Sequence, residues 1–134
     1  MSLQLHLRER EGVAILDLDG RLTVGDEVAT FRERMQKLIE SGQKNIILNM
    51  NKVDYVDSTG LGALVMCYTT LQRAGGNVRL LNLSRRSIEL LVMTKLATIF
   101  EVFNDEQNAI NSFFPDREIK RFDILNFVQQ HKEE

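Results

Sequence analysis

Hydrophobic and polar positions alternate in two runs at the start of the chain. Residues 3–8 place a leucine at every second position, and residues 13–19 continue with aliphatic side chains on one face. A period of two is typical of a β-strand with one buried face. The runs are separated by a short turn at Gly12, so they are expected to pair as an antiparallel hairpin. Asp17 and Asp19 fall on the other face of the second strand, near its end.

A helical pattern follows the hairpin. Residues 27–40 carry apolar side chains at intervals of three and four, with charged residues on the other side. Thr23 or Asp26 can cap this helix, and Gly42 can end it because glycine adopts the left-handed conformation without a steric cost. The next run, 45–50, does not alternate and is typical of a strand covered on both faces.

Strands and helices continue to alternate along the chain. The expected elements are a helix over 61–74, a strand over 78–83, a short helix capped by Ser84, a strand over 99–103 and a helix that starts at 104–107 in the manner of a capping box. Strands joined through helices pair in parallel with right-handed crossovers. The pattern therefore predicts a single α/β domain with a small mixed β-sheet, in which an antiparallel hairpin is followed by parallel βαβ units.

This domain is expected to span residues 1–114. Residues 115–134 form a C-terminal extension that is too apolar for a disordered tail. Asp123 can cap a short helix over 124–130, which we expect to pack on the domain or on a second subunit. The last four residues are expected to be frayed.

The helix over 61–74 has two faces of different character. One face is apolar and is assigned to the core: Leu61, Leu64, Val65, Tyr68 and Leu71. The opposite stripe is small and only weakly polar: Thr59, Gly62, Ala63, Met66, Thr70 and Arg73. Because it lacks the charge of a solvated face, it either packs against another helix of the domain or docks a partner, with Met66 as an adaptable contact.

Composition narrows the classes of function. The 134 residues carry a net charge of −2, which gives no electrostatic attraction to nucleic acid or to anionic membranes. No apolar run approaches the roughly 18 residues of a membrane span, and the first residues lack the layout of a signal peptide. The one cysteine, Cys67, excludes an intrachain disulfide, so a cytoplasmic location is expected.

The sequence offers little for catalysis. It has no glycine-rich phosphate loop with a lysine, and its two histidines lie near the termini, which argues against a catalytic triad or a histidine metal site. Cys67 lies among core positions of a helix and is interpreted as a small buried hydrophobic residue. The aspartate pairs Asp17/Asp19 and Asp54/Asp57 are interpreted as solvated strand ends and turns. We therefore expect a protein that is not an enzyme and that holds no metal or cofactor.

One motif stands where a helix begins. Residues 57–62 read Asp-Ser-Thr-Gly-Leu-Gly and follow the strand expected over 45–50. The first N–H groups of a helix have no intrahelical partner, and the helix dipole adds partial positive charge there, so a hydroxyl or phosphate oxygen is stabilised. Ser58 can therefore be an N-cap, a phosphorylation site or both, and Asp57 can simply favour the helix dipole.

The motif resembles the phosphoacceptor loop of the STAS domain, specifically that of the bacterial anti-sigma-factor antagonists, and its six residues match without a gap. Other similar stretches are Gly20-Arg21-Leu22, Ala74-Gly75-Gly76 and Leu80-Leu81-Asn82-Leu83, which precedes Ser84. The order of elements is similar from residue 3 to residue 113, about four-fifths of the chain. The resemblance implies a small mixed sheet with helices packed mainly on one face.

The resemblance also implies a function. Ser58 corresponds to the serine that an anti-sigma-factor serine kinase of the GHKL type phosphorylates. The remaining residues of the switch loop are Asp57, Thr59, Gly60, Leu61 and Gly62. The unphosphorylated form is expected to bind the kinase and free the sigma factor. The phosphorylated form is expected to let go, and a PP2C-type phosphatase restores it.

Positions beside this loop are expected to contact the partner: Thr23, Met66, Thr70 and Arg73. Many antagonists have an acid where this chain has Thr23, which leaves room for a divergent partner. Two other functions therefore stay open. One is a constitutive STAS interaction module in a signalling scaffold or a membrane-lipid transport complex, and the other is a nucleotide or small-ligand sensor.

Overall fold

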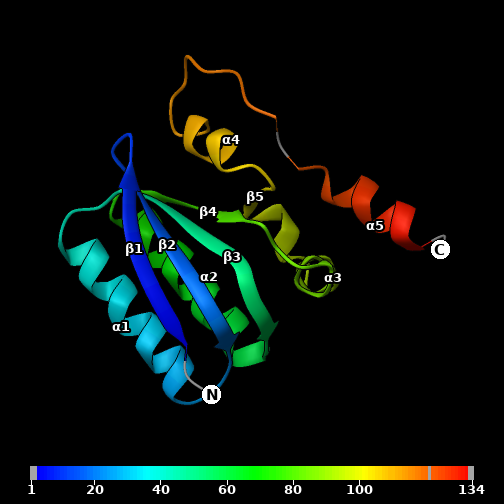
Figure 1. The fold of residues 1–134 in the computed structure, drawn as a ribbon, viewed down its shortest axis with the longest axis horizontal. Helices are drawn as coiled ribbons and strands as arrows, with labels where there is room; N and C mark the ends of the chain where they lie inside the picture. Colours follow the sequence, from blue (N-terminus) through cyan, green and yellow to red (C-terminus); the bar gives the residue numbers. More distant parts are fainter. Residues whose placement is uncertain (1–2, 121, 133–134) are drawn as a thin grey trace.

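The computed structural model describes residues 3–120 and 122–132. The strands of its sheet are β1 (Gln4–Arg10), β2 (Val13–Leu22), β3 (Asn45–Val56), β4 (Asn77–Leu81) and β5 (Glu101–Phe103), in the spatial order β1-β2-β3-β4-β5 (Figure 1). The helices are α1 (Asp26–Glu40), α2 (Ser58–Arg73), α3 (Arg85–Met93), the short 3₁₀ turn η1 (Leu96–Thr98), α4 (Glu106–Asn111) and α5 (Ile124–Lys132). β1 and β2 are antiparallel and the other pairs are parallel, so the predicted mixed sheet is confirmed.

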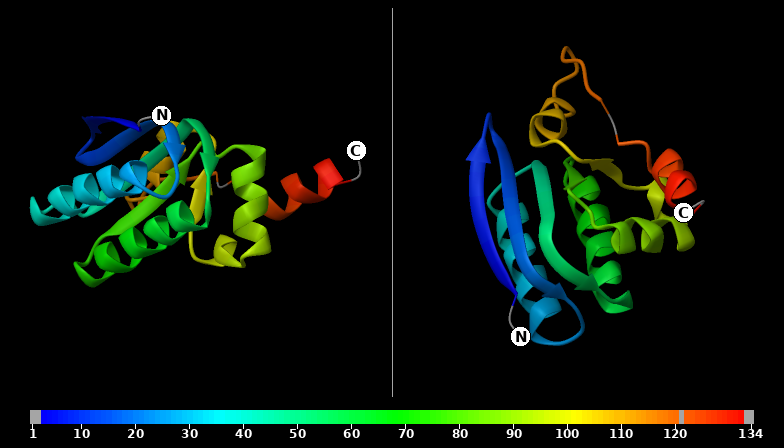
Figure 2. Two further views of the ribbon diagram at one scale, coloured as in Figure 1. Left: turned by 90° about the horizontal axis from the view of Figure 1, so that it is seen from below. Right: turned by 45° about the vertical axis from the view of Figure 1, so that its right-hand side comes forward.

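The helices lie mainly on one face of the sheet, as expected. α1 and α2 run side by side beneath β1–β4 (Figure 2), and their apolar faces enclose the larger core with the sheet. Fully buried side chains of this core include Phe31 of α1, Leu48 of β3 and Leu71 of α2. The short helix α4 covers the other face near β4 and β5, where a second, smaller cluster forms around Ile47 and Phe103. No helix within residues 3–120 and 122–132 lies over the rest of that face.

β3 is twice as long as its apolar run predicts. The run 45–50 is buried on both faces, as expected, but the strand continues to Val56. Two register shifts against β2 each leave one extra residue on β3. These bulges break the period of two, so the sequence shows no alternation there, although Val53 and Val56 still point into the core. Residues 51–56, which lie beyond the strand expected over 45–50, are therefore strand as well.

Helix ends follow the sequence at most positions. Ser84 and Asp105 cap α3 and α4 by accepting hydrogen bonds from the amides three residues later. Gly42 ends α1 with a φ of 93°. The expected cap of α1 by Thr23 or Asp26 is wrong, because Gly25, with a φ of 107°, occupies the N-cap position and no side chain caps the helix.

Two other expectations need correction at the edges of the domain. Leu7 is 41% exposed, because β1 is an edge strand with a neighbouring strand on one side only. In the extension, Asp123 does cap α5, through the Asn126 amide at 3.0 Å, but the helix runs to Lys132 instead of fraying from residue 131. Residues 133–134 lie outside the described part of the chain.

The extension packs on the domain. The Phe122 amide donates to the Val102 carbonyl at 3.3 Å, so the chain runs beside the free edge of β5. Phe122 and Ile124 pack against the larger core, and α5 contacts α3 while its far end projects away from the body (Figures 1 and 2).

Candidate functional site

Asp57 ties together two loops at the carboxyl end of the parallel strands. Its side chain caps α2 by accepting from the Gly60 amide at 2.8 Å, and its second oxygen accepts from the Val24 amide at 2.9 Å. Its own amide donates to the Leu22 carbonyl at 3.3 Å. The Val24 amide, followed by the Gly60 amide, holds the pKa of this carboxyl below its ordinary value. Asp57 is therefore the structural clamp of the motif.

Gly60 allows this close approach. A Cβ atom on Gly60 would lie 2.0 Å from the Leu22 carbonyl oxygen, which no side chain can tolerate. A Cβ on Gly62 would meet nothing within 4 Å, because that position faces outward. The two glycines of the motif thus have different roles, one in packing and one at the surface.

Ser58 is the first residue of α2, and its side chain is exposed. The N-cap role considered for it is wrong, because Asp57 takes that position. Its hydroxyl has no hydrogen-bond partner among the described residues. Thr59 beside it is exposed as well, whereas Leu61 is buried in the core. A hydroxyl at this place is open to a modifying enzyme and lies at the positive end of the helix dipole.

The outer stripe of α2 is covered by α1 at one position and open at another, and docking of a partner there stays a prediction. Ala63 is buried where α1 packs beside α2, as expected for a face covered by another helix. Met66 is 54% exposed, and Thr70 is half-buried at a hollow of about 120 Å³ between the two helices. The stripe begins at Thr59, beside Ser58, and contains no acidic residue.

The four expected partner-binding positions are not all close to the motif. Thr23 lies next to it, since its neighbour Val24 binds Asp57. Arg73 is exposed in the last turn of α2, about 22 Å along the helix axis from Ser58 at 1.5 Å per residue. A partner that contacts both must cover the whole length of α2.

Three exposed groups at the same end of the sheet could not be found from the sequence. Val24 is 66% exposed beside the Asp57 carboxylate, and Tyr55 is 41% exposed at the end of β3. The Arg86 guanidinium lies 5.6 Å from the centre of the Tyr55 ring. Only the fold brings α3 next to the end of β3, so no spacing within the chain could have shown this contact.

The other candidate groups have structural surroundings. Cys67 is buried, and desolvation raises the pKa of its thiol to about 12, in agreement with a core residue. Asp17 was expected to be solvated but is half-buried: Arg8 binds both of its oxygens, at 2.8 and 3.1 Å, and Asn49 donates at 2.7 Å. Although burial opposes its ionisation, the hydrogen bonds from Arg8 and Asn49 hold the pKa of Asp17 below its ordinary value. No helix in the described part of the chain has the length and apolarity needed to cross a membrane.

These features define a small mixed-sheet α/β domain that presents a serine at the start of its second helix. Residues 4–109 match the STAS domain, so the chain belongs to the STAS domain family. The matched region ends within α4 and leaves out the C-terminal extension.

Several similar proteins are regulators of sigma factors. The anti-sigma F factor antagonist of Paenibacillus polymyxa is 29% identical over 113 residues, which cover 82% of this chain and 94% of that protein. The anti-sigma-B factor antagonist of Bacillus subtilis is 29% identical over 110 residues, which cover 82% and 99%. The structure of the unphosphorylated anti-sigma factor antagonist SpoIIAA matches with a TM-score of 0.63 at 25% identity and covers 84% and 98% of the two chains. SpoIIAA has also been solved in a phosphorylated form.

Proposed function

We propose that this protein is an anti-sigma-factor antagonist that phosphorylation of Ser58 switches off. In its unphosphorylated form it binds an anti-sigma serine kinase of the GHKL type through the N-terminal half of α2. The observation that carries the proposal is the exposed Ser58 hydroxyl, which has no hydrogen-bond partner among the described residues and lies beside the Asp57 cap and the uncharged N-terminal half of α2. The names of the similar proteins support the same assignment.

The switch follows from electrostatics. A phosphate on Ser58 adds a charge of roughly −1.5 to −2 at a loop that already holds Asp54 and Asp57. The amides at the start of α2 offset part of this charge within the domain. A partner surface that fits a neutral hydroxyl cannot offset it, and burying an uncompensated charge costs several kcal/mol, which weakens binding about a thousandfold. No large conformational change is needed, and a PP2C-type phosphatase in the same cytoplasmic compartment would reverse the state.

The assignment of the phosphosite is tested with an anti-sigma serine kinase that binds the unmodified protein. The wild type, Ser58→Ala and Thr59→Ala are each incubated with the kinase and ATP, and the modified residue is mapped by mass spectrometry. We expect one phosphate on Ser58 in the wild type and in Thr59→Ala, and none in Ser58→Ala. Thr59→Ala is the matched control, because it removes the neighbouring exposed hydroxyl. Phosphate on Thr59 would overturn the assignment to Ser58. Kinase binding that ignores every change at Ser58 would instead favour a constitutive interaction module.

A further inference from the structure

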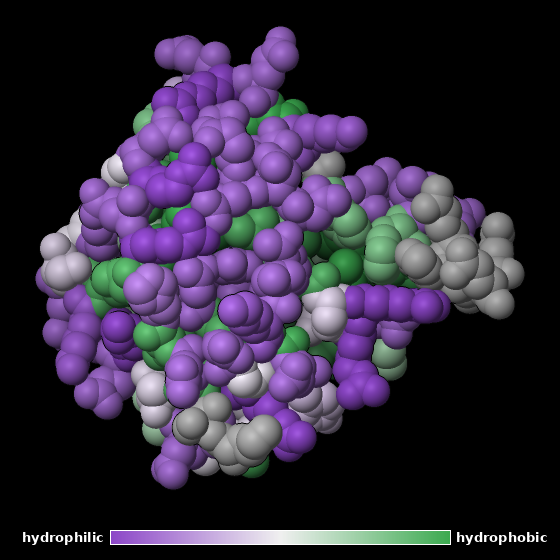
Figure 3. All heavy atoms as spheres, in the orientation of Figure 1, coloured by the Kyte–Doolittle hydropathy of each residue, from purple (hydrophilic) through white to green (hydrophobic). Residues whose placement is uncertain are grey.

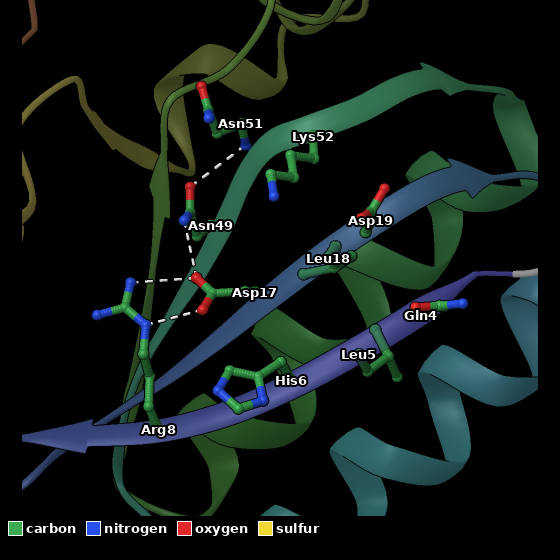
Figure 4. Close-up of a pocket in the computed structure, with 10 residues that line it drawn as sticks. All are labelled: Gln4, Leu5, His6, Arg8, Asp17, Leu18, Asp19, Asn49, Asn51 and Lys52. Carbon is green, nitrogen blue, oxygen red and sulfur yellow. Dashed lines mark hydrogen bonds and ion pairs between the residues drawn. The ribbon is translucent and has the colours of Figure 1, made fainter.

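A second candidate site lies on the face of the sheet opposite α1 and α2. A hollow of about 580 Å³ opens over β1, β2 and β3, on the part of this face that α4 does not cover. Side chains from all three strands point into it (Figure 4), and the surface around it is mostly hydrophilic (Figure 3). It lies on the opposite face of the sheet from α2, so the switch described above does not use it.

One side of the hollow is a fixed polar floor. Arg8 binds Asp17 and also forms an ion pair with Glu106 of α4, and Asn49 links Asp17 to Asn82. The ion pair with Arg8 keeps the pKa of the Glu106 carboxyl below its ordinary value. These side chains use their hydrogen-bonding groups on one another and join the three strands. This polar floor is therefore rigid and leaves few donors or acceptors for a ligand.

The other side of the hollow carries two opposite charges without partners. Asp19 and Lys52 are register neighbours on the parallel strands β2 and β3, and both are exposed. Neither forms an ion pair or a side-chain hydrogen bond with any described residue. Two side-chain amides lie at the same place, those of Asn51 and of Gln4, which is the register neighbour of Asp19 on β1. Neither amide forms a hydrogen bond with another described residue.

A β-bulge is what turns Lys52 toward the hollow. Between Asn49 and Lys52, β3 holds one residue more than β2 holds between Asp17 and Asp19. Without that extra residue, a strand period of two would place Lys52 on the opposite face from Asn49, against the core. The bulge therefore aims an ammonium group at the space beside an unpaired carboxylate, and bulges commonly re-aim side chains at functional sites.

We infer that this hollow binds a small zwitterion of the free α-amino acid class. The ligand carboxylate accepts hydrogen bonds from the Lys52 ammonium, and the ligand ammonium donates to the Asp19 carboxylate. The amides of Gln4 and Asn51 and the imidazole of His6 line the space that is left for the ligand side chain.

The test is a titration of the ¹⁵N-labelled full chain with each standard L-amino acid up to about 10 mM, followed by two-dimensional NMR. We expect at least one amino acid to shift the amides of residues 17–20 and 49–53 saturably. Lys52→Gln and Asp19→Asn should each weaken that binding at least about tenfold. Lys37→Gln is the matched control, because it removes an exposed lysine from α1 on the other face, and it should leave the affinity unchanged.

Two derivatives of the amino acid that binds most tightly distinguish the contact with Lys52 from the contact with Asp19. Its N-acetyl form lacks the ammonium, and its amide form lacks the carboxylate, so both should bind at least about tenfold more weakly. The inference is overturned if no amino acid shifts these amides, or if Lys52→Gln and Asp19→Asn bind as well as the wild type. Equal binding of the N-acetyl form would also overturn it, since the site would then be a simple anion site. The spectra report the fold of every variant in the same experiment.

Discussion

Asp57 joins two loops that are 33 residues apart in the sequence, through the amides of Val24 and Gly60. The serine beside it makes no contact of this kind and is left free for a partner or a kinase. The carboxylate of Asp57 builds the loop, and we propose that the hydroxyl of the adjacent Ser58 carries the signal. Substitutions at these neighbours should therefore have separable effects.

The Asp57 clamp should make stability depend on pH. The pKa of Asp57 is lowered in the folded state, so the ionised carboxylate stabilises the fold above the unfolded pKa of about 3.9, and this stabilisation is lost as the pH falls through the lower folded value. Asp57→Asn should lower the free energy of unfolding by about 1 kcal/mol at pH 7. In urea denaturation, the difference from the wild type should shrink as the pH falls below about 3.9.

Asp54→Asn is the matched control for this series. Asp54 is exposed on β3 and accepts no hydrogen bond from the described residues, so its substitution should change the free energy of unfolding by less than about 0.5 kcal/mol. If Asp57→Asn and Asp54→Asn have equal effects at pH 7, Asp57 does not clamp the loops.

Substitutions of the two glycines of the motif, Gly60 and Gly62, should have opposite effects on stability. Gly60→Ala forces a methyl group against the Leu22 carbonyl oxygen and should cost about 2 kcal/mol or more. Gly62→Ala adds a methyl in open space within a helix and should stabilise the fold by about 0.5–1 kcal/mol. Thermal unfolding measures both changes, and effects of the same sign would contradict the geometry.

Among the elements, β3 determines where the site and the sheet-face hollow lie. The sequence predicts its first half from an apolar run, together with the order of the strands and α-helices, the cap at Ser84 and the start of α4 near residues 104–107. It does not predict the bulged second half, because each extra residue shifts the period and makes the pattern look like a loop. For the same reason the exposed positions of Lys52 and Tyr55 appear only in the structure.

The extension is the element that the family domain lacks. We propose the boundary at residue 114, and a chain that ends at Asp116 should then unfold in one cooperative transition at a lower temperature than the full chain. Phe122→Ala in the full chain should account for about 1–2 kcal/mol of the loss, because Phe122 packs on the core beside β5. An unfolded truncated chain would place the boundary later, and an unchanged melting temperature would mean that the extension does not stabilise the domain.

At the scale of the whole molecule, the two faces of the sheet carry surfaces of different kinds. The helical side presents a stripe along α2 that starts beside Ser58 and is uncharged as far as Thr70, and the open side presents opposite charges on β2 and β3. The strands that form the hollow end at the loops that Asp57 ties together. One small domain can therefore hold a partner surface and a ligand surface without shared side chains.

The most direct test of the central claim is the affinity of the kinase for three forms of this protein: unmodified, phosphorylated at Ser58, and Ser58→Ala. Isothermal titration with the purified kinase measures each Kd, and two-dimensional NMR checks that the three forms share one fold. We predict that Ser58→Ala binds within about twofold of the unmodified protein and that phosphorylation weakens binding about a thousandfold, or by about 4 kcal/mol. Equal affinity of the phosphorylated and unmodified forms would contradict the account.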